Sequence, residues 1–383
     1  AVTAVAWLLA GSPDDAVVRT VSVLVIACPH ALGLAIPLVV SISTGLAARN
    51  GILVKDRLAL EQVRLIDLVL FDKTGTLTKA SHRVTGVHAV DGDDDSLLSL
   101  AAAVESESEH PLARAIVAAA HGPVPAASGF RSMSGRGVEA TVAGQAVAVG
   151  GPALLNERQV EVPDQVAAAA EEWRNRGASI LLVVEGDRVV GALSLEDEVR
   201  PEAIEAVGEL KRLGIRVEMV TGDARQVADA VGETLGIDEI HAEILPEDKH
   251  SIVVDLQDEG HRVAMVGDGV NDAPALAQAD VGIAVGAGTD VAIESAGIVL
   301  ASDDPRGVVA TIKLSRAGYR KMVENLVWAT GYNVVAIPLA AGALAWAGIV
   351  LDPAAAAVLM SASTVIVALN AQLLRRLDLR PAT

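Results

Sequence analysis

The sequence is short of cysteine and of basic residues, and each shortage excludes a class of protein. Cys28 is the single cysteine among 383 residues, so an intrachain disulfide framework is excluded. Lys and Arg number 30 against 49 Asp and Glu, which gives a formal net charge of −19. Binding nucleic acid requires a basic face against its phosphates, so nucleic acid is not an expected partner.

The start of the chain has no initiator methionine, no basic n-region and no signal-cleavage pattern. Residues 1–10 are almost entirely apolar, which indicates the end of a transmembrane helix. We therefore expect this chain to be the C-terminal part of a longer protein. Hydrophobic residues make up 51% of it despite the negative net charge, so apolar and acidic segments must be separated along the sequence.

Three further apolar segments are long enough to cross a bilayer, at 17–43, 323–350 and 353–374. Lys and Arg residues follow the first segment, precede the second and follow the third. The positive-inside rule then places the block from about residue 45 to about residue 320 in the cytoplasm. The sequence thus predicts an integral membrane protein in contact with lipid, with a soluble cytoplasmic part.

The soluble block has the pattern of one α/β core interrupted by an insertion. Apolar, β-branched runs such as 68–71, 217–220 and 263–266 alternate with helical segments, which indicates a doubly wound parallel sheet of the Rossmann type. Within the block, the sequence pattern changes to one that predicts alanine-rich helices and short strands. The expected ranges are 56–79 and 195–315 for the core and 80–194 for an inserted α+β domain.

The string Asp72-Lys73-Thr74-Gly75-Thr76-Leu77-Thr78 directly follows the first of these strands. Sites in open α/β folds lie beyond the carboxyl ends of the strands, where a carboxylate such as Asp72 can attack phosphorus and become an aspartyl-phosphate. Gly75 lets backbone N–H groups approach the phosphoryl oxygens, and Thr74 can present its carbonyl to a magnesium ion. The string resembles the phosphorylation signature of P-type ATPases.

Two more strand ends carry similar chemistry, at Thr221-Gly222-Asp223 and at 267–272. Singly, such turns are mostly structural. Together with Asp72 they resemble the haloacid-dehalogenase-like phosphoryl-transfer fold. That resemblance implies magnesium bound by Asp72, Asp268 and the Thr74 carbonyl. The implied catalytic set is Asp72, Lys73, Thr74, Thr221, Gly222, Asp223, Lys249, Asn271 and Asp272.

Physical roles follow for several members of this set. Lys249, in a Leu-Pro-Glu-Asp-Lys string that resembles the lysine segment of the family, would offset charge on the phosphoryl oxygens. Thr221 can donate a hydroxyl hydrogen bond to the same oxygens. Asn271 and Asp272 would orient the magnesium shell.

The insertion carries a second set of motifs. Glu105, then Ser108-Glu109-His110-Pro111, and later Gly135-Arg136-Gly137 resemble the ATP pocket of heavy-metal P-type ATPases. The resemblance implies that His110 and Pro111 start a helix beside the adenine and that Gly135 and Gly137 permit close backbone approach. Each motif is weak alone. Where the family often has Gly-Asn, this chain has Gly150-Gly151-Pro152, so that part of the pocket is left unassigned.

The first complete span contains Cys28-Pro29-His30 near its middle. Pro29 removes a backbone donor and should free the carbonyl of Val25, which would unwind the helix locally. Thiolate and imidazole suit a soft or borderline transition metal better than sodium, potassium or calcium. The alternative is a simple proline kink with a buried thiol.

The last two spans add Tyr332, Asn333, Met360 and Ser363 at membrane depth. With the Cys-Pro-His segment, this combination resembles the copper-transporting subgroup of heavy-metal P-type ATPases. The resemblance implies ATP-driven copper export with ATP and Mg²⁺, and an α/β phosphorylation domain with an inserted nucleotide-binding domain, flanked by transmembrane helices. It further implies a monomeric pump in the plasma membrane that receives copper from a metallochaperone. Cys28, His30, Tyr332, Asn333, Met360 and Ser363 would bind the metal.

Alternatives remain open at this point. A zinc or cadmium pump would share the machinery, but a charged Lys or Asp would then be expected in the last spans. A membrane-anchored phosphatase of the same superfamily is a second alternative, which the Glu-His-Pro insertion disfavours. A metal-binding protein with an inactive enzyme domain is a third, and intact Asp72, Lys249 and Asp268 argue against it. No Thr-Gly-Glu actuator motif occurs, which again indicates part of a longer pump. Copper(I) and copper(II) are not separated.

Overall fold

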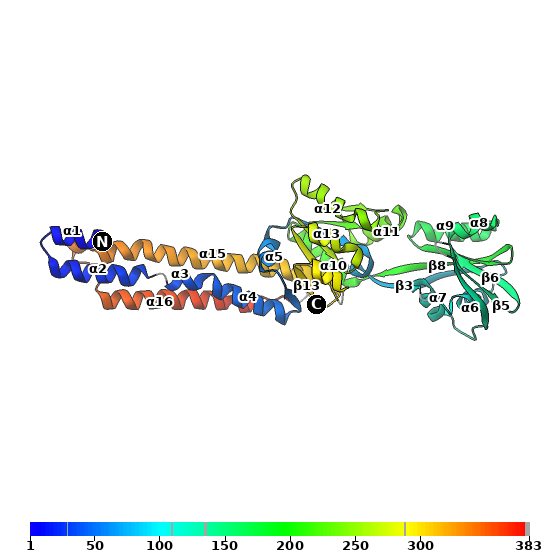
Figure 1. Cartoon of the computed structure of the whole chain (residues 1–383), viewed down its shortest axis with the longest axis horizontal. Coiled ribbons are helices and arrows are strands. Elements are labelled where there is room, and N and C mark those ends of the chain that lie inside the picture. The colour runs from blue at the N-terminus through cyan, green and yellow to red at the C-terminus, as the bar shows by residue number, and fades with distance from the viewer. Residues whose placement is uncertain (29, 109, 134–135, 287–288, 380–383) are drawn as a thin grey trace. The chain divides into compact units, whose positions relative to one another are not determined.

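A computed structural model describes residues 1–28, 30–108, 110–133, 136–286 and 289–379 (Figure 1). The chain divides into two compact units. The helical unit comprises residues 1–65, 297–301 and 307–383, and the α/β unit comprises residues 66–296 and 302–306.

The core of the α/β unit is a parallel sheet with the strand order β12-β11-β2-β9-β10. Strands β2, β11 and β12 are buried along their whole length, as expected for a sheet covered by helices on both faces. The strands are β2 (Leu68–Asp72), β9 (Arg216–Val220), β10 (Glu239–His241), β11 (Val263–Gly267) and β12 (Val281–Val285). The helices are α10 (Pro201–Arg212), α11 (Arg225–Leu235), α12 (Lys249–Asp258), α13 (Ala273–Gln278) and α14 (Asp290–Ser295). The predicted Rossmann-like core is confirmed.

The insertion forms an antiparallel sheet with the order β3-β8-β7-β6-β5-β4 (Figure 1). Strands β3 and β8 pair over their length, from Thr78 opposite Val199 to Ala89 opposite Gly191, so they carry the chain out of the core and back. The strands are β3 (Thr78–Ala89), β4 (Ala127–Met133), β5 (Gly137–Val142), β6 (Gln145–Gly150), β7 (Ser179–Glu185) and β8 (Arg188–Val199). The helices are α6 (Asp94–Glu105), α7 (Pro111–Ala119), α8 (Pro152–Arg158) and α9 (Asp164–Asn175).

The helical unit holds the apolar segments. Its elements are α1 (Val2–Leu9), α2 (Pro13–Ala27), α3 (His30–Ala35), α4 (Pro37–Arg49), β1 (Ile52–Val54), α5 (Arg57–Gln62), β13 (Ile298–Leu300), α15 (Arg306–Ala341) and α16 (Pro353–Gln372). Among the described residues, two helical segments are long and apolar enough to cross a membrane, at Pro13–Arg49 and Pro353–Arg376. Helix α15 begins well before the predicted span at 323–350 and ends at Ala341, after which a short turn of helix covers Ala345–Ala347.

The predicted span at 17–43 is not one continuous helix. Helix α2 ends at Ala27, α3 covers only His30–Ala35, and α4 begins at Pro37. Proline accounts for the second break, because Pro37 has no backbone N–H to continue the ladder of α3. The first break lies at the Cys-Pro-His segment, where the pattern predicted local unwinding.

Candidate phosphoryl-transfer and metal sites

Three carboxylates meet at the carboxyl ends of β2 and β11. Asp72 is the last residue of β2, and Asp268 and Asp272 follow β11. The two strands are parallel neighbours, so their ends lie at the same edge of the sheet. One oxygen of each of the three carboxylates lies within 4.8 Å of the others. The structure thus brings together acids that are about 200 positions apart in the sequence.

Gly75 is required by the loop that follows Asp72. Its φ of +76° is in the left-handed region, which glycine adopts at little cost. A Cβ at this position would collide with the carboxylate of Asp268. Gly75 therefore serves to admit Asp268 beside the loop, a role that sequence reasoning did not assign to it.

A buried lysine stands between two of the carboxylates. The Lys249 Nζ lies 2.5 Å from the Asp72 Oδ1 and 2.7 Å from the Asp272 Oδ1. Burial lowers the pKa of Lys249, but Asp72 and Asp272 outweigh it and the pKa is raised overall. Lys249 therefore stays charged. Its contacts in this structure are to carboxylates, so its predicted role at phosphoryl oxygens remains a prediction.

Burial raises the pKa of Asp72 to about 7, and Asp272 adds to the shift while Lys249 opposes it. Burial also raises the pKa of Asp268, with Asp272 again adding. Three acids face one lysine here, and carboxylate oxygens are the ligands that hard divalent cations prefer. This donor set fits a magnesium ion.

The neighbouring strand end supplies further members of the predicted set. Val220, the last residue of β9, lies opposite Asp72, so Thr221 follows at the same edge of the sheet. The Thr221 Oγ1 accepts a hydrogen bond of 3.1 Å from the Asp223 backbone N–H. The side chain of Asp223 forms an ion pair with the buried Lys73. Gly222 lies between Thr221 and Asp223, while the side chains of Thr74 and Asn271 are exposed.

Arg200 was missed by sequence reasoning. Its Nε donates to the Thr78 carbonyl at 3.0 Å, and its Nη2 lies 2.9 Å from the Asp303 carboxylate. It therefore joins the end of β8 to the segment after the Asp72 loop. A single arginine before a helix carries no motif, and its partners are 122 and 103 positions away, so no local signal could have found it.

Three of the five predicted nucleotide residues line one cavity of about 300 Å³ in the inserted domain. Glu105, His110 and Gly137 all border it. Pro111 opens α7, and the His110 Nδ1 accepts from the Leu112 N–H at 3.2 Å, which caps that helix as predicted. A Cβ on Gly137, whose φ is +133°, would meet the Val149 carbonyl. Glu109 and Gly135 lie outside the described residues. Gly150 and Gly151, left unassigned from sequence, also line the cavity.

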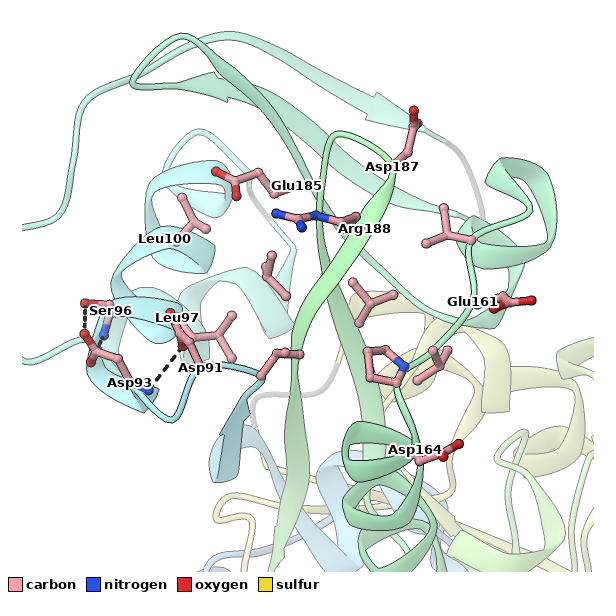
Figure 2. Close-up of a pocket in the computed structure, with 16 residues that line it drawn as sticks. Asp91, Asp93, Ser96, Leu97, Leu100, Glu161, Asp164, Glu185, Asp187 and Arg188 are labelled. Atoms are coloured by element: carbon pink, nitrogen blue, oxygen red, sulfur yellow. Dashed lines mark hydrogen bonds between the residues drawn. The ribbon is translucent and has the colours of Figure 1, made fainter.

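A larger hollow of about 800 Å³ lies elsewhere in the inserted domain (Figure 2). Its acidic lining residues are Asp91, Asp93, Glu161, Asp164, Glu185 and Asp187, against the single basic residue Arg188. Asp93 caps α6 by accepting from the Ser96 N–H at 3.0 Å. This surplus of negative charge would repel the phosphates of a nucleotide, which makes the smaller cavity the better candidate for a nucleotide site.

Glu105 is buried at the cavity of about 300 Å³. Burial raises its pKa to about 7, opposed by a hydrogen bond from Ser108. A carboxyl whose folded pKa lies above its unfolded value of 4.5 stabilises the fold fully below about pH 4.5. That stability is lost as the pH rises through about 7. At pH 8 the buried charge costs about 3 kcal/mol. We therefore expect Glu105→Gln to raise the Tm at pH 8 and to leave it unchanged near pH 4, where the carboxyl is neutral in both states.

Thermal unfolding of the wild type and the variant at both pH values checks this expectation. Glu107→Gln, two positions further at an exposed site, is the matched control and should leave the Tm unchanged at either pH. A Glu105→Gln gain of equal size at both pH values would contradict the argument.

The Cys-Pro-His segment lies at the first helix break. Cys28 is extended, with φ −68° and ψ 113°, and its Sγ lies 3.9 Å from the His30 Nε2. Both side chains are exposed, and Pro29 is outside the described residues. The prediction that the Val25 carbonyl is free was wrong. It accepts the Cys28 N–H at 3.4 Å, because the chain tightens to a shorter-range hydrogen bond where the helix ends.

Packing places the other predicted metal residues at the level of this break. Before the break in the chain, Ile26 packs with Ala336 of α15 and Ala356 of α16. After the break, Ala31 packs with Ala329 and Val367 of the same two helices. The positions between these contacts are those of Tyr332 and Asn333 on α15 and of Met360 and Ser363 on α16. Ser363 is buried, and its hydroxyl has no hydrogen-bond partner within the described ranges.

The second helix break is tied to α15 and α16 by Asn325. Its side chain is 1% exposed. The Asn325 Nδ2 donates to the Ala35 carbonyl at 3.3 Å, and its Oδ1 accepts from the Asn370 Nδ2 at 2.9 Å. This link holds α3, the short helix that begins at His30, against its two neighbours. No motif in the sequence indicated this link.

The fold and the strand-end site define a phosphoryl-transfer protein of the haloacid dehalogenase type. The model of the haloacid dehalogenase-like hydrolases matches residues 66–280, which is more than half of the chain, and a second model of that description matches residues 251–312. The chain therefore belongs to the haloacid dehalogenase-like hydrolases.

The similar proteins are metal-transporting P-type ATPases. The chain is 50% identical over 363 residues to the copper-exporting P-type ATPase B of Archaeoglobus fulgidus, covering 94% of this chain and 52% of that protein. A crystal structure of a zinc-transporting PIB-type ATPase in the E2.Pi state matches with a TM-score of 0.83 and 37% identity, covering 96% of this chain and 59% of that chain. The predicted resemblance to the copper-transporting P-type ATPases is confirmed.

A third match is the catalytic domain of the CPx-ATPase CopB-B, solved to follow conformational changes upon nucleotide binding. Its TM-score is 0.58 and its identity 29%, over 71% of this chain and 98% of that one. The chain spans about half the length of the curated relatives that it matches.

Proposed function

We propose that this chain is part of a pump that uses ATP to export copper across a membrane through an aspartyl-phosphate at Asp72. The observation that carries the proposal is the cluster of Asp72, Asp268, Asp272 and Lys249 at the carboxyl ends of neighbouring strands. The similarity to copper-exporting P-type ATPases supports it.

The proposed transfer needs a nucleophile, charge neutralisation and positioning. An Asp72 oxygen forms a bond to the γ-phosphorus of ATP as the bond to ADP breaks. Lys249 holds Asp72 in place through its 2.5 Å contact. Lys249 would also offset charge on the phosphoryl oxygens, and Thr221 would donate a hydroxyl hydrogen bond to them. A magnesium ion held by Asp72, Asp268 and the Thr74 carbonyl would supply positive charge against the transferred group. Glu105, His110 and Gly137 bind the nucleotide.

The proposed cargo follows from the ligands at the helix break. Thiolate, imidazole and thioether groups from Cys28, His30 and Met360 favour a soft or borderline metal, and Tyr332, Asn333 and Ser363 complete the set. A zinc or cadmium pump is the alternative, since a zinc-transporting ATPase has a similar fold. Helix α16 contains no charged residue, whereas a charged Lys or Asp is expected in the last spans of a zinc pump. A phosphatase is disfavoured by the inserted domain, because its cavity is lined by Glu105 and His110 of the motif that resembles an ATP pocket.

The proposed setting is the plasma membrane, with the α/β unit on the cytoplasmic side. The basic residues that flank the apolar segments support this orientation. We further propose a monomeric pump that receives copper from a metallochaperone.

Copper binding tests the proposed cargo. We expect Cys28→Ser and His30→Ala each to weaken copper affinity at least about 100-fold, because loss of a direct ligand should exceed the 10–100-fold cost of losing an outer partner. Competition with a chromophoric chelator, with reductant and without, measures this in the full chain. Nucleotide binding should be unchanged in both variants.

His261→Ala is the matched control for histidine loss. His261 lies in the α/β unit, where its Nδ1 is 3.3 Å from an Asp67 oxygen, and its removal should not change copper affinity. Unchanged affinity in both Cys28→Ser and His30→Ala would make the break a simple proline kink.

A further inference from the structure

A hollow of about 420 Å³ in the helical unit belongs neither to the phosphoryl-transfer site nor to the helix break between Cys28 and His30. It lies between α4, α5 and α15. Most of its wall is apolar and includes Val40, Leu60, Leu314, Met322 and Leu326. Its volume falls within the range of ligand pockets. We refer to it as the interfacial pocket, because α4 closes the apolar segment Pro13–Arg49 and ends in a basic residue.

One end of the interfacial pocket is cationic. Arg57 and Arg64 both line it. The Arg64 guanidinium lies 3.8 Å from the ring centroid of Tyr319, which orients it over the pocket wall. Arg57 is 3.1 Å from Glu61, which also lines the pocket, so two guanidinium groups and one carboxylate leave this end with one net positive charge. Guanidinium groups are the side chains best suited to bind phosphate oxygens.

A buried polar group also lines this pocket. Ser43 is 5% exposed, and its hydroxyl finds no hydrogen-bond partner among the residues that the structure describes. A buried hydroxyl without a partner destabilises the site, so a ligand atom that accepts from it or donates to it would recover that cost. A Cβ on Gly318, across from it, would stand 3.1 Å from the Ser43 Oγ. Glycine at 318 therefore keeps the space beside this hydroxyl open.

The charge of the surrounding segments indicates the sign of the ligand. Residues 44–65 and 307–326 carry eight Lys and Arg against three Asp and Glu, in a chain whose net charge is −19. The basic residues are thus concentrated on the elements that form the interfacial pocket. A positive surface at the end of an apolar segment attracts anionic lipid headgroups.

We propose that the interfacial pocket binds one anionic phospholipid. The phosphate lies at Arg57 and Arg64, the ester or glycerol oxygens reach the Ser43 hydroxyl, and an acyl chain follows the apolar wall formed by Val40 and Leu326. The proposal rests on the membrane location proposed above, but it involves neither ATP nor copper. Its failure can therefore be distinguished from failure of the proposed pump function.

The test measures lipid binding to the full chain in detergent by native mass spectrometry. Phosphatidylglycerol and phosphatidylcholine with the same acyl chains are titrated separately, and inorganic phosphate forms a third arm. We expect one phosphatidylglycerol to bind about tenfold more tightly than phosphatidylcholine. Both lipids carry a phosphate, but the choline ammonium cancels its charge and would be repelled by the arginines, whereas phosphatidylglycerol keeps a net negative charge. Inorganic phosphate should not displace it, since phosphate has no acyl chain for the apolar wall.

Two variants and one control assign the effect to the pocket. Arg57→Gln combined with Arg64→Gln should remove the preference for phosphatidylglycerol. Ser43→Ala should weaken phosphatidylglycerol binding without lowering the Tm of the lipid-free chain, because its hydroxyl has no partner to lose. Arg49→Gln, an exposed cation on α4 that does not line the pocket, should bind as the wild type does.

Several results would overturn the proposal. Equal binding of the two lipids would mean an apolar hollow without headgroup recognition. Displacement by inorganic phosphate would mean an anion site that is not a lipid site. Full phosphatidylglycerol binding by both the arginine and the serine variants would place the lipid elsewhere, and no bound lipid at all would mean that a protein segment or a second copy covers the pocket.

Discussion

Asp72→Asn is expected to abolish covalent labelling of the chain by γ-labelled ATP. The substitution replaces the attacking carboxylate by a carboxamide of nearly the same shape, which cannot form an acyl-phosphate. It also removes one of three clustered negative charges, so folding should be retained. Nucleotide binding should persist, because Glu105, His110 and Gly137 line a separate cavity.

The measurement is acid-stable, hydroxylamine-sensitive label after incubation with ATP and Mg²⁺. Asp255→Asn, an exposed acid on the same helix as Lys249, is the control and should label as the wild type does. Hydroxylamine-sensitive label that persists in Asp72→Asn would refute Asp72 as the nucleophile.

Lys249→Met is expected to abolish labelling as well, and in addition to destabilise the fold. The Lys249 Nζ contacts Asp72 and Asp272 in a buried site. Among the residues that the structure describes, no other cation forms an ion pair with these two carboxylates. Removing one partner of a buried ion pair costs about 3–5 kcal/mol, because the remaining charge is left uncompensated. Added Mg²⁺ should restore part of the lost Tm, since the three carboxylates form a suitable cation site.

Chemical unfolding with and without Mg²⁺ measures both effects. The matched control is Lys211→Met, which breaks the 2.7 Å pair with Asp238 at a partly exposed position and should cost no more than about 1 kcal/mol. If Lys249→Met and Lys211→Met cost the same, the buried cluster does not depend on Lys249 for its charge balance.

The nucleophile and its strand were predictable because both signals are local. A short apolar run followed at once by Asp72 and a glycine-containing turn places a carboxylate at a strand end whatever the rest of the chain does. The parallel sheet was predictable for a similar reason, since strand and helix patterns alternate along the core. Both predictions are confirmed at the level of the fold. The chemical roles of the individual site residues stay predictions.

Other features depended on contacts between distant residues. The helix break at Cys28 was expected from Pro29, but the partner of the Val25 carbonyl was not, because a proline shows which donor is lost and not how the chain compensates. The Ala35 carbonyl, just before the break at Pro37, accepts a hydrogen bond from Asn325, which is 290 positions away. No periodicity or motif connects two such positions.

The sequence by itself determined the order of the parts: apolar segments at both ends, an α/β core, an inserted domain, and carboxylates at three strand ends. These features follow from local composition, hydrophobic periodicity and short motifs, all of which depend only on residues that are close together in the sequence. Only the tertiary structure decided which charges meet. Lys249 lies 177 positions from Asp72, and Arg200 lies 103 positions from Asp303. The environment of each group, including the raised pKa of Glu105 and the cationic end of the interfacial pocket, depends on burial and on neighbours that only folding brings together.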